Sequence, residues 1–467
     1  MSASRKGLAS QWIRVVVVVL AMNSIPQTVN AQTQPIGPLN TEDIQTLRNL
    51  PSLQSSDNLL RSAAQVRSLI RQAHTFSPLL RELNYAVDAA EQDINVAKGA
   101  QAPQVTVRGS STVVTGGLPT ASSASGMPYI GVNASLPVYD FGRIDATVKN
   151  REARKDAGTS RYEQQANQLA IETVTLCLEY TKRRALLFAV EDYSQTVQRL
   201  ADMLTKVVEA DPGRKAELVQ AKSRLLQSQQ SKESERSGVE QFRIRLNRLI
   251  GPDNAAMCDG IGASFLEKPD IEKIRAAVGE HPQVRAFKYD LDAANRQIDE
   301  ISASRKPQVQ ATAAHAPVLP GLNNEYYQSI TLTASLPIYD GNILRSSQQA
   351  ALERTRAATE RIDFTVMQLD TEYRERNQLA NDSLRRVGEF TSLIEINDRV
   401  RKDFFVQWYS LGRRSLFELL AIEQEQYNLQ RGYFTSLFDA MINIATIQGN
   451  AGLLTAAEPH SGAIGAN

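Results

Sequence analysis

The sequence lacks the residue clusters that most enzymes and metal proteins need. Its 467 residues include only 4 histidines and 2 cysteines, and no two histidines lie at the spacing of metal ligands. It has no glycine-rich phosphate loop followed by Lys-Ser or Lys-Thr, and no nucleophile elbow. The formal net charge is +1, from 52 basic and 51 acidic residues, which does not favour nucleic acid as a partner. We therefore expect no enzyme activity, no cofactor and no metal.

Long apolar runs are also scarce. One short run, Val15–Met22, follows two basic residues and precedes small residues at Val29–Ala31. This order is typical of a secretory signal peptide over residues 1–31, with Gln32 as the first mature residue; a buried N-terminal helix is the alternative. No stretch reaches the roughly 20 apolar residues that a membrane-spanning helix needs. The sequence therefore predicts an exported chain that is either soluble or a β-type membrane protein.

What the chain does contain is an internal repeat, offset by about 200 residues. Three segments return in its second half: Tyr85-Ala-Val-Asp-Ala-Ala90 as Tyr289-Asp-Leu-Asp-Ala-Ala294, Pro103-Gln-Val105 as Pro307-Gln-Val309, and Ala134-Ser-Leu-Pro-Val-Tyr-Asp140 as Ala334-Ser-Leu-Pro-Ile-Tyr-Asp340. The unit is too long for a solenoid, so each copy must build the same larger structure. We expect a linker, a first repeat, an inter-repeat segment, a second repeat and a disordered tail at 32–56, 57–250, 251–280, 281–454 and 455–467.

Each copy contains the alternation of β-strands. Apolar residues occupy every second position, with small or polar residues between them: Ile130, Val132, Ala134, Leu136 and Val138 in the first copy, and Ile330, Leu332, Ala334, Leu336 and Ile338 in the second. Weaker partner strands lie near Val105 and Val309. We expect strands at about 103–114, 128–138, 307–316 and 327–338.

Hairpins of this kind commonly pack on a soluble core, and that alternative remains. Each apolar face is, however, about 9 to 10 residues long, which is the length of a tilted strand that crosses a bilayer. Serine, threonine and asparagine on the other face suit a water-filled lumen. A spanning barrel needs at least about eight strands and must close, whereas one chain supplies four. If these strands lie in a membrane, several copies must share one barrel.

Two proline-free segments predict very long helices. No proline occurs between Pro137 and Pro212, or between Pro337 and Pro459. Apolar residues in both segments recur in steps of three and four, as in a coiled coil: Tyr193, Val197, Leu200, Leu204 and Val207, then Ile362, Val366, Leu369 and Tyr373. We expect long helices at about 141–208 and 341–408, each on the order of 100 Å at 1.5 Å per residue, and returning helices at about 214–249 and 413–450. A coiled-coil scaffold or tether is the alternative.

Each long helix reverses at a short break, Asp211-Pro-Gly213 in the first copy and Ser410-Leu-Gly412 in the second. Basic residues follow both breaks, and a carboxylate comes about one turn later: Arg214 with Glu217, and Arg413 and Arg414 with Glu418. Helix capping and a solvated charged end would explain these residues equally well.

Together these features resemble the TolC family of outer-membrane efflux and secretion channels. The resemblance spans residues 57–454 and rests on the doubled Ala-Ser-Leu-Pro-Val/Ile-Tyr-Asp strand ends and on the turn Tyr409-Ser-Leu-Gly-Arg-Arg-Ser-Leu-Phe-Glu-Leu-Leu420. It implies a mainly α fold with a small antiparallel β component. Three chains would form a homotrimer and close one twelve-stranded barrel in the outer-membrane lipid of a Gram-negative cell. It further implies a periplasmic helical tunnel, with an equatorial belt near 57–80 and 250–285.

The resemblance also assigns roles at the two turns. Tyr409 and Arg414 would belong to the tethers that hold the aperture closed, with Glu217 facing them, and Glu418 would form a carboxylate ring. A second acidic ring of the family is missing here, because the chain has Ala421 at that position. The turns would dock a periplasmic adaptor, itself coupled to an inner-membrane ABC transporter or proton-driven pump, through Asp211, Gly213, Arg214, Leu411, Gly412, Arg413 and Ser415.

The two cysteines offer a further prediction within this geometry. Cys177 precedes the first turn by some 34 residues, and Cys258 follows it by some 46, beyond the expected end of the return helix near Ile250. The two sulfur atoms would then lie at similar heights beside the belt. We expect a disulfide; two free, buried thiols are the alternative.

The favoured function is a passive trimeric conduit that is opened by partner docking. The turn sequence from Gly412 to Leu420 resembles members that serve type I protein secretion more than drug-efflux members. Multidrug or small-molecule efflux is the alternative cargo, and a periplasmic coiled-coil adaptor or tether is the alternative class.

Overall fold

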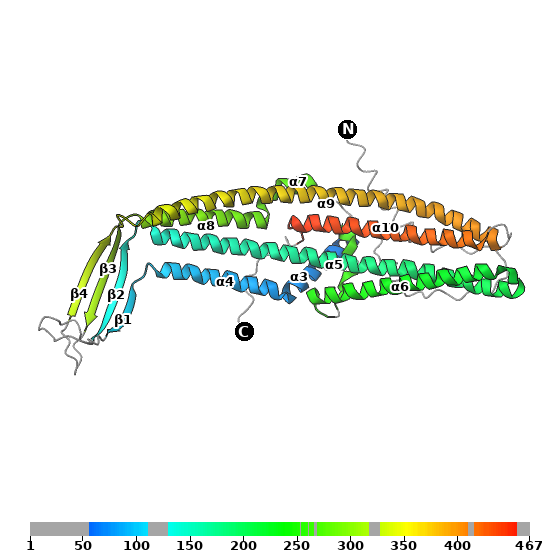
Figure 1. Ribbon diagram of the computed structural model, residues 1–467, viewed down its shortest axis with the longest axis horizontal. Helices are drawn as coiled ribbons and strands as arrows, with labels where there is room; N and C mark the ends of the chain where they lie inside the picture. Colours follow the sequence, from blue (N-terminus) through cyan, green and yellow to red (C-terminus); the bar gives the residue numbers. More distant parts are fainter. Residues whose placement is uncertain are drawn as a thin grey trace, which may run out of the picture. The chain divides into compact units, whose positions relative to one another are not determined.

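A computed structural model describes residues 56–110, 129–252, 254–259, 261–265, 269–316, 327–409 and 415–454. The expected signal peptide, the expected linker up to residue 55 and the expected tail lie outside these ranges. The fold is mainly helical with one four-stranded antiparallel sheet, which confirms the predicted fold class (Figure 1).

The elements of the first half follow the predicted order. They are α3 (Ser56–Phe76), α4 (Pro78–Gly99), β1 (Gln104–Ser110), β2 (Tyr129–Tyr139), α5 (Arg143–Ala210), the 3-10 helix η2 (Pro212–Arg214) and α6 (Lys215–Ile250). Short helices occupy the segment between the repeats: η3 (Ala255–Cys258), η4 (Ile261–Phe265), α7 (Ile271–Ala276) and η5 (Val278–Glu280). The second half repeats the order with α8 (Pro282–Ser304), β3 (Gln308–Ala316), β4 (Tyr327–Ser335), α9 (Ile343–Tyr409) and α10 (Leu416–Asn450).

The chain forms two compact units, and neither coincides with one repeat. The sheet unit comprises the described residues of Pro78–Gln164 and Gly279–Gln368, and the helical unit comprises the described residues of Met1–Ser77, Gln165–Val278 and Leu369–Asn467. Each unit therefore draws on both halves of the sequence. The reason is the length of α5 and α9, since each contributes residues to both units.

The sheet joins the two repeats in the order β1-β2-β3-β4, with every neighbouring pair antiparallel. The register collects the apolar residues on one face: Val105 pairs with Ala134, Leu136 with Ala311, and Ala311 with Leu332. The alternating pattern predicted β4 to residue 338, but the strand ends at Ser335. Because Ser335 pairs with Gln308, the first residue of β3, the residues after it have no strand opposite them.

The same tight turn leads from β2 into α5 and from the segment after β4 into α9. Asp140 accepts hydrogen bonds from the backbone N–H groups of Gly142 (3.0 Å) and Ile144 (2.7 Å), and Asp340 accepts one from Leu344 (2.8 Å). The two residues after each aspartate have positive φ: Phe141 (53°) and Gly142 (83°), then Gly341 (66°) and Asn342 (67°). The aspartate of the repeated Tyr-Asp motif thus caps the helix that follows it. The two long helices begin at residues 143 and 343, two residues later than the predicted starts at about 141 and 341.

Helices of the sheet unit pack mainly through small apolar clusters and long-range polar contacts. Ile94 and Ala97 of α4 pack against Ile144 and Val148 of α5. The Asn150 side-chain amide donates to the backbone oxygen of Ala293 in α8 (2.5 Å). Ion pairs between α5 and α8 add to this packing: Arg161 with Asp290, and Glu163 with Arg285.

The core of the helical unit lies where α5, α6, α9 and α10 meet. The residues at the predicted coiled-coil positions Tyr193, Val197, Leu200 and Leu204 are all buried there. Two glycines permit close packing, because an added Cβ would lie 2.2 Å from Ile171 Cγ1 at Gly449 and 2.5 Å from Phe390 Cζ at Gly432. The steps of three and four therefore predicted the buried side of α5 correctly.

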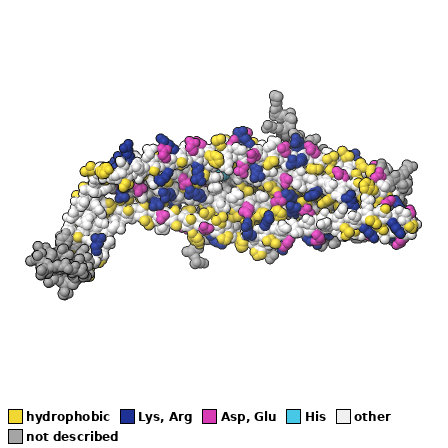
Figure 2. All heavy atoms as spheres, in the orientation of Figure 1, with side chains coloured by type: hydrophobic (Ala, Val, Ile, Leu, Met, Phe, Trp, Pro, Cys, Tyr) yellow, Lys and Arg dark blue, Asp and Glu magenta, His cyan; other side chains and the backbone are white. Residues whose placement is uncertain are grey.

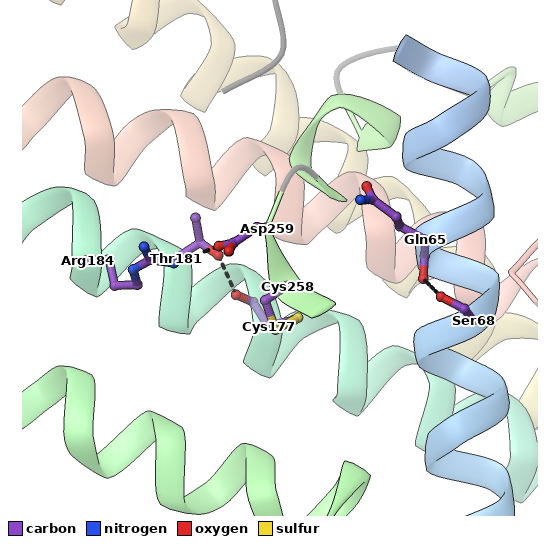
Figure 3. The surroundings of a disulfide bond; sticks show 7 residues. All are labelled: Gln65, Ser68, Cys177, Thr181, Arg184, Cys258 and Asp259. Carbon is purple, nitrogen blue, oxygen red and sulfur yellow. Dashed lines mark hydrogen bonds and ion pairs between the residues drawn. A yellow bond between two sulfur atoms is a disulfide. The ribbon is translucent and has the colours of Figure 1, made fainter. Parts of the chain in front are cut away.

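A disulfide between Cys177 and Cys258 ties η3 to α5, with the two Cα atoms 5.3 Å apart (Figure 3). Two turns along α5, Arg184 donates to Asp259 at 2.6 Å. The same segment contacts α3, where the Ser62 hydroxyl donates to the backbone oxygen of Ile261 at 3.2 Å. The inter-repeat segment is thus fixed to two helices, and the pairing is the one that the positions of the cysteines predict.

Candidate functional site

The first helix turn is a compact, capped reversal. Helix α5 ends at Ala210, and the Asp211 carboxylate accepts a hydrogen bond from the N–H of Gly213 (3.0 Å), which caps η2. Arg214 forms an ion pair with Glu217 across 3.3 Å. Both partners belong to the same turn, so this contact accounts for Glu217 locally. Its predicted contact with Tyr409 and Arg414 stays a prediction.

The second turn is described only at its two ends. Helix α9 ends at Tyr409, whose side chain is not described, and residues 410–414 lie outside the described ranges. The predicted sites Leu411, Gly412, Arg413 and Arg414 therefore stay predictions. On the returning side, Ser415 and Glu418 form a reciprocal capping box, in which the carboxylate accepts from the Ser415 N–H at 3.1 Å. In this chain Glu418 therefore has a structural role beside its predicted place in a carboxylate ring.

Behind the turns, a tyrosine links α5 to α10. The Tyr193 hydroxyl donates to Gln424 Oε1 at 2.7 Å, and its ring stacks on Tyr427 with the centroids 5.1 Å apart. Burial raises the pKa of Tyr193, so the hydroxyl remains a donor at neutral pH. Sequence reasoning placed Tyr193 on the buried side of the helix but missed this polar link. The only signal was a tyrosine at an apolar position of the coiled-coil pattern.

A second polar group, which we call the hairpin ion network, joins α9 to α10. Arg401 contacts Asp398 on its own helix (2.8 Å) and Glu423 on α10 (3.4 Å), and Lys402 contacts Asp398 at 2.6 Å. Burial acts to raise the pKa of Asp398, but hydrogen bonds from Lys402 and Arg401 outweigh it and hold that pKa below its usual range. For Glu423, burial outweighs the attraction of Arg401 and raises the pKa. Sequence reasoning missed this network as well.

These contacts are polar links between neighbouring helices. Beside the network, the Asn397 side-chain amide donates to Gln426 Oε1 at 2.8 Å, which is a further contact between α9 and α10. Across the described ranges, no three His, Cys, Asp or Glu side chains lie close enough together to hold a metal ion. The role that these contacts suit is structural, because they fix how α5, α9 and α10 pack against one another behind the turns.

The second candidate region is the apolar face of the sheet. Its large side chains are exposed, with Ile330 at 89%, Leu332 at 68% and Val107 at 72% of their maximal areas. Beyond the end of β4, Ile338 is exposed at 93%. On the side that Figure 2 shows, basic and acidic side chains are interspersed over the helices, and the strands have few of either. None of the helices in the described part of the chain is long and apolar enough to span a bilayer.

Comparison with known proteins gives the family. A search of curated proteins finds no match. Among solved structures, the outer membrane protein VceC of Vibrio cholerae is 17% identical, with a TM-score of 0.70 over 83% of this chain and 96% of that one. A membrane protein of Pseudomonas aeruginosa is 15% identical, with a TM-score of 0.72 over 83% and 90%. The MtrE outer membrane channel of Neisseria gonorrhoeae, in its open state, is 14% identical, with a TM-score of 0.70 over 83% and 89%.

Likeness at these identities shows the fold, and a sequence model of one family adds the assignment. Residues 69–252 and 274–375, more than half of the chain, match the model of the outer membrane efflux proteins. The match includes the first helix turn, the whole of the described sheet and the N-terminal half of α9, up to residue 375. Fold and sequence thus agree with the resemblance drawn from the repeated motifs. The chain belongs to the outer membrane efflux protein family.

Proposed function

We propose that the chain is one subunit of a homotrimeric outer-membrane channel, in which three four-stranded sheets close one twelve-stranded barrel. The observation that carries the proposal is the exposed apolar face of the sheet, where Ile330 and Leu332 are left uncovered by the described part of the chain. The sheet order also leaves β1 and β4 as edges. Unpaired edges are not tolerated in lipid, so each edge must meet another subunit. Membership of the efflux protein family excludes the adaptor or tether interpretation.

The trimer would act as a passive conduit. Its long helices would line a periplasmic tunnel, and its two helix turns would dock a periplasmic adaptor that is coupled to an inner-membrane transporter. That transporter would supply the energy, because transport through an open pore needs no chemistry from this chain. Polar side chains on the other face of the sheet, such as Thr106 and Asn133, support a water-filled lumen.

Assembly gives the first test. Protein extracted from outer membranes should migrate as a trimer that resists heating in mild detergent, and it should conduct ions in planar lipid bilayers. Purification as a stable monomer without detergent, with no conductance, would refute the proposal.

The closed aperture gives the second test. Tyr409 and Arg414 would restrain the second turn, so replacing them together by Phe and Ser should raise the conductance. Asp211→Ala is a matched control, because it removes the cap of the first turn and leaves both residues intact. A double variant that conducts like the unmodified channel would remove this assignment and leave the fold unaffected.

For the cargo we favour secreted protein, exported through an inner-membrane ABC transporter as in type I secretion. The support is the turn sequence from Gly412 to Leu420, which resembles members that serve secretion. Small molecules are the alternative, and the family description of efflux suits both. The chain should be expressed in a strain without its own channel, once with a secretion adaptor and ABC transporter and once with an efflux adaptor and proton-driven pump. Export of a reporter protein only in the first pairing supports secretion, and restored drug resistance only in the second contradicts it.

A further inference from the structure

The described strands hold a single charged side chain. Residues Gln104–Ser110, Tyr129–Tyr139, Gln308–Ala316 and Tyr327–Ser335 include no aspartate, glutamate or lysine, and Arg108 is their only arginine. Between Gln104 and Tyr139 the whole sequence has no acidic residue, and between Gln308 and Ser335 it has one, Glu325, outside the described ranges. Arg108 is therefore the only formal charge that the described strands would bring to a barrel.

The register decides which face of the sheet Arg108 occupies. It lies opposite Gly131, whereas its neighbour Val107 lies opposite Val132. Alternate residues point to opposite faces, so Arg108 shares the polar face with Thr106 and Asn133, and the exposed valines lie on the other. The arginine is exposed and forms no ion pair with any residue in the described ranges. Gly131 opposite it has no side chain, which leaves room for a long side chain above the sheet.

Its position along the strand is also informative. The polar face is hollowed at its helix-proximal end, where a cavity of about 600 Å³ is lined by Gln104, Ser135, Gln308 and Gln310, among others. Arg108 lies four residues beyond Gln104, or roughly 13 Å at 3.3 Å per residue. It therefore stands near the end of β1 that is far from the helices. In a trimer β1 would pair with β4 of another copy, and the described residues of β4 include no acidic group to neutralise it.

We propose that Arg108 and its two symmetry copies form a ring of positive charge in the barrel lumen, which favours anions and anionic segments of the cargo. The inference rests on the proposed trimeric channel. Strands about 4.8 Å apart give a twelve-stranded wall with a circumference on the order of 60 Å, and hence a diameter near ~20 Å. Side chains that reach inward bring the three guanidinium groups toward the ~8 Å screening length of physiological salt. Their positive potentials then overlap across the lumen.

The sign of this preference would be opposite to that of the carboxylate ring predicted at the entrance.

The test is the ion preference of single trimers in planar bilayers under a tenfold KCl gradient. Arg108→Gln removes the ring, so its reversal potential should shift toward cation selectivity. A potential near kT changes the chloride and the potassium concentrations about 2.7-fold each in opposite directions, so the chloride-to-potassium permeability ratio should fall about sevenfold. Arg108→Glu should shift it further. Arg108→Lys should retain the ratio, since the charge is kept. Thr106→Gln, which changes the size of a side chain on the same face without changing its charge, is the matched control.

Each outcome decides the matter once trimer assembly is verified by heat-resistant migration. If the unmodified channel and Arg108→Gln conduct with the same reversal potential, the ring has no role. If Thr106→Gln shifts the ratio as much as Arg108→Gln does, lumen size rather than charge is responsible, and the inference also fails. If the unmodified protein forms no channel at all, the proposed function fails first, which is a distinguishable result.

Discussion

The sheet and helix α10 place similar side chains in opposite surroundings. Ile444 and Ile447 of α10 are 0% and 1% exposed, whereas Ile330 of β4 is 89% exposed. Burial of one such side chain contributes about 1.5–3 kcal/mol, so the chain gains this stabilisation in α10 and forgoes it in the sheet. The surroundings of Ile444 and Ile447 are complete within one chain, whereas those of the sheet would include lipid and other copies in the proposed trimer. The comparison predicts that damage to the two regions has different consequences.

The largest effect is expected inside the helical unit. Ile444→Asp would bury a carboxylate with no partner, and such substitutions cost more than about 4 kcal/mol. The helical unit should then fail to fold. Circular dichroism should show a loss of helix, and limited proteolysis should cleave α10. A native melting profile for this variant would show that α10 is not enclosed as described.

The second-largest loss of stability is expected on removal of the disulfide, which also lies in the helical unit. The bridge closes a loop of 81 residues, for which the chain-entropy relation gives about 4 kcal/mol. Cys177→Ser with Cys258→Ser should lower the melting temperature of the helical unit and leave barrel assembly intact. Reductant should lower the melting temperature of the unmodified protein in the same way and have no effect on the double variant. An equal effect of reductant on both proteins would contradict the assignment.

The matching substitution in the sheet should behave differently. Ile330→Asp places a charge on the side that would face lipid in the proposed barrel, which costs at most roughly 2 kcal/mol in each subunit. The variant should keep its helix content but lose heat-resistant trimers and membrane insertion. Thr331→Asp, one residue away on the polar face, is the matched control and should assemble. If both variants assemble equally well, the two faces do not differ in their surroundings.

The sequence could predict much of this contrast because it depends on periodicity. Alternation in β2 and β4 identified the apolar face, and steps of three and four identified Val197 and Leu204 as buried. Both patterns are local, so they need no knowledge of partners. They do not report where a strand loses its neighbour, which is why β4 was predicted three residues too long.

Contacts between distant residues were beyond such reasoning. Tyr193 and Gln424 are 231 residues apart, and nothing in either local pattern indicates that the hydroxyl of one reaches the amide of the other. The hairpin ion network is similar, because Asp398, Arg401 and Lys402 resemble an ordinary solvated helix face. Only the packing of α10 against α9 shows that Glu423 lies next to Arg401.

Within α9 and α10, the hairpin ion network gives a smaller effect that depends on pH. Asp398 is buried and its pKa is lowered, so its stabilisation is present at neutral pH and is lost as the pH falls through the folded-state pKa, below the ordinary 3.8. Asp398→Asn should cost about 1.5–3 kcal/mol at pH 7, and its melting temperature should approach that of the unmodified protein below pH 3.8. Glu423→Gln is the control. The raised pKa of Glu423 means that its neutral form is favoured by folding, so this variant should lose little at pH 7.

The smallest expected effect separates the polar link at Tyr193 from the packing around it. Tyr193→Phe removes the hydrogen bond to Gln424 but keeps the ring that stacks on Tyr427. We expect a loss of about 1 kcal/mol in stability, the usual value for one hydrogen bond. If the link also restrains the helices behind the turns, the variant should show more frequent openings in planar bilayers. Tyr427→Phe keeps the stack and the Tyr193 hydroxyl, so it is the matched control for the conductance measurement. Equal opening frequencies in the two variants would mean that Tyr193 contributes only to packing. More openings in Tyr193→Phe alone would mean that its hydrogen bond helps to keep the aperture closed.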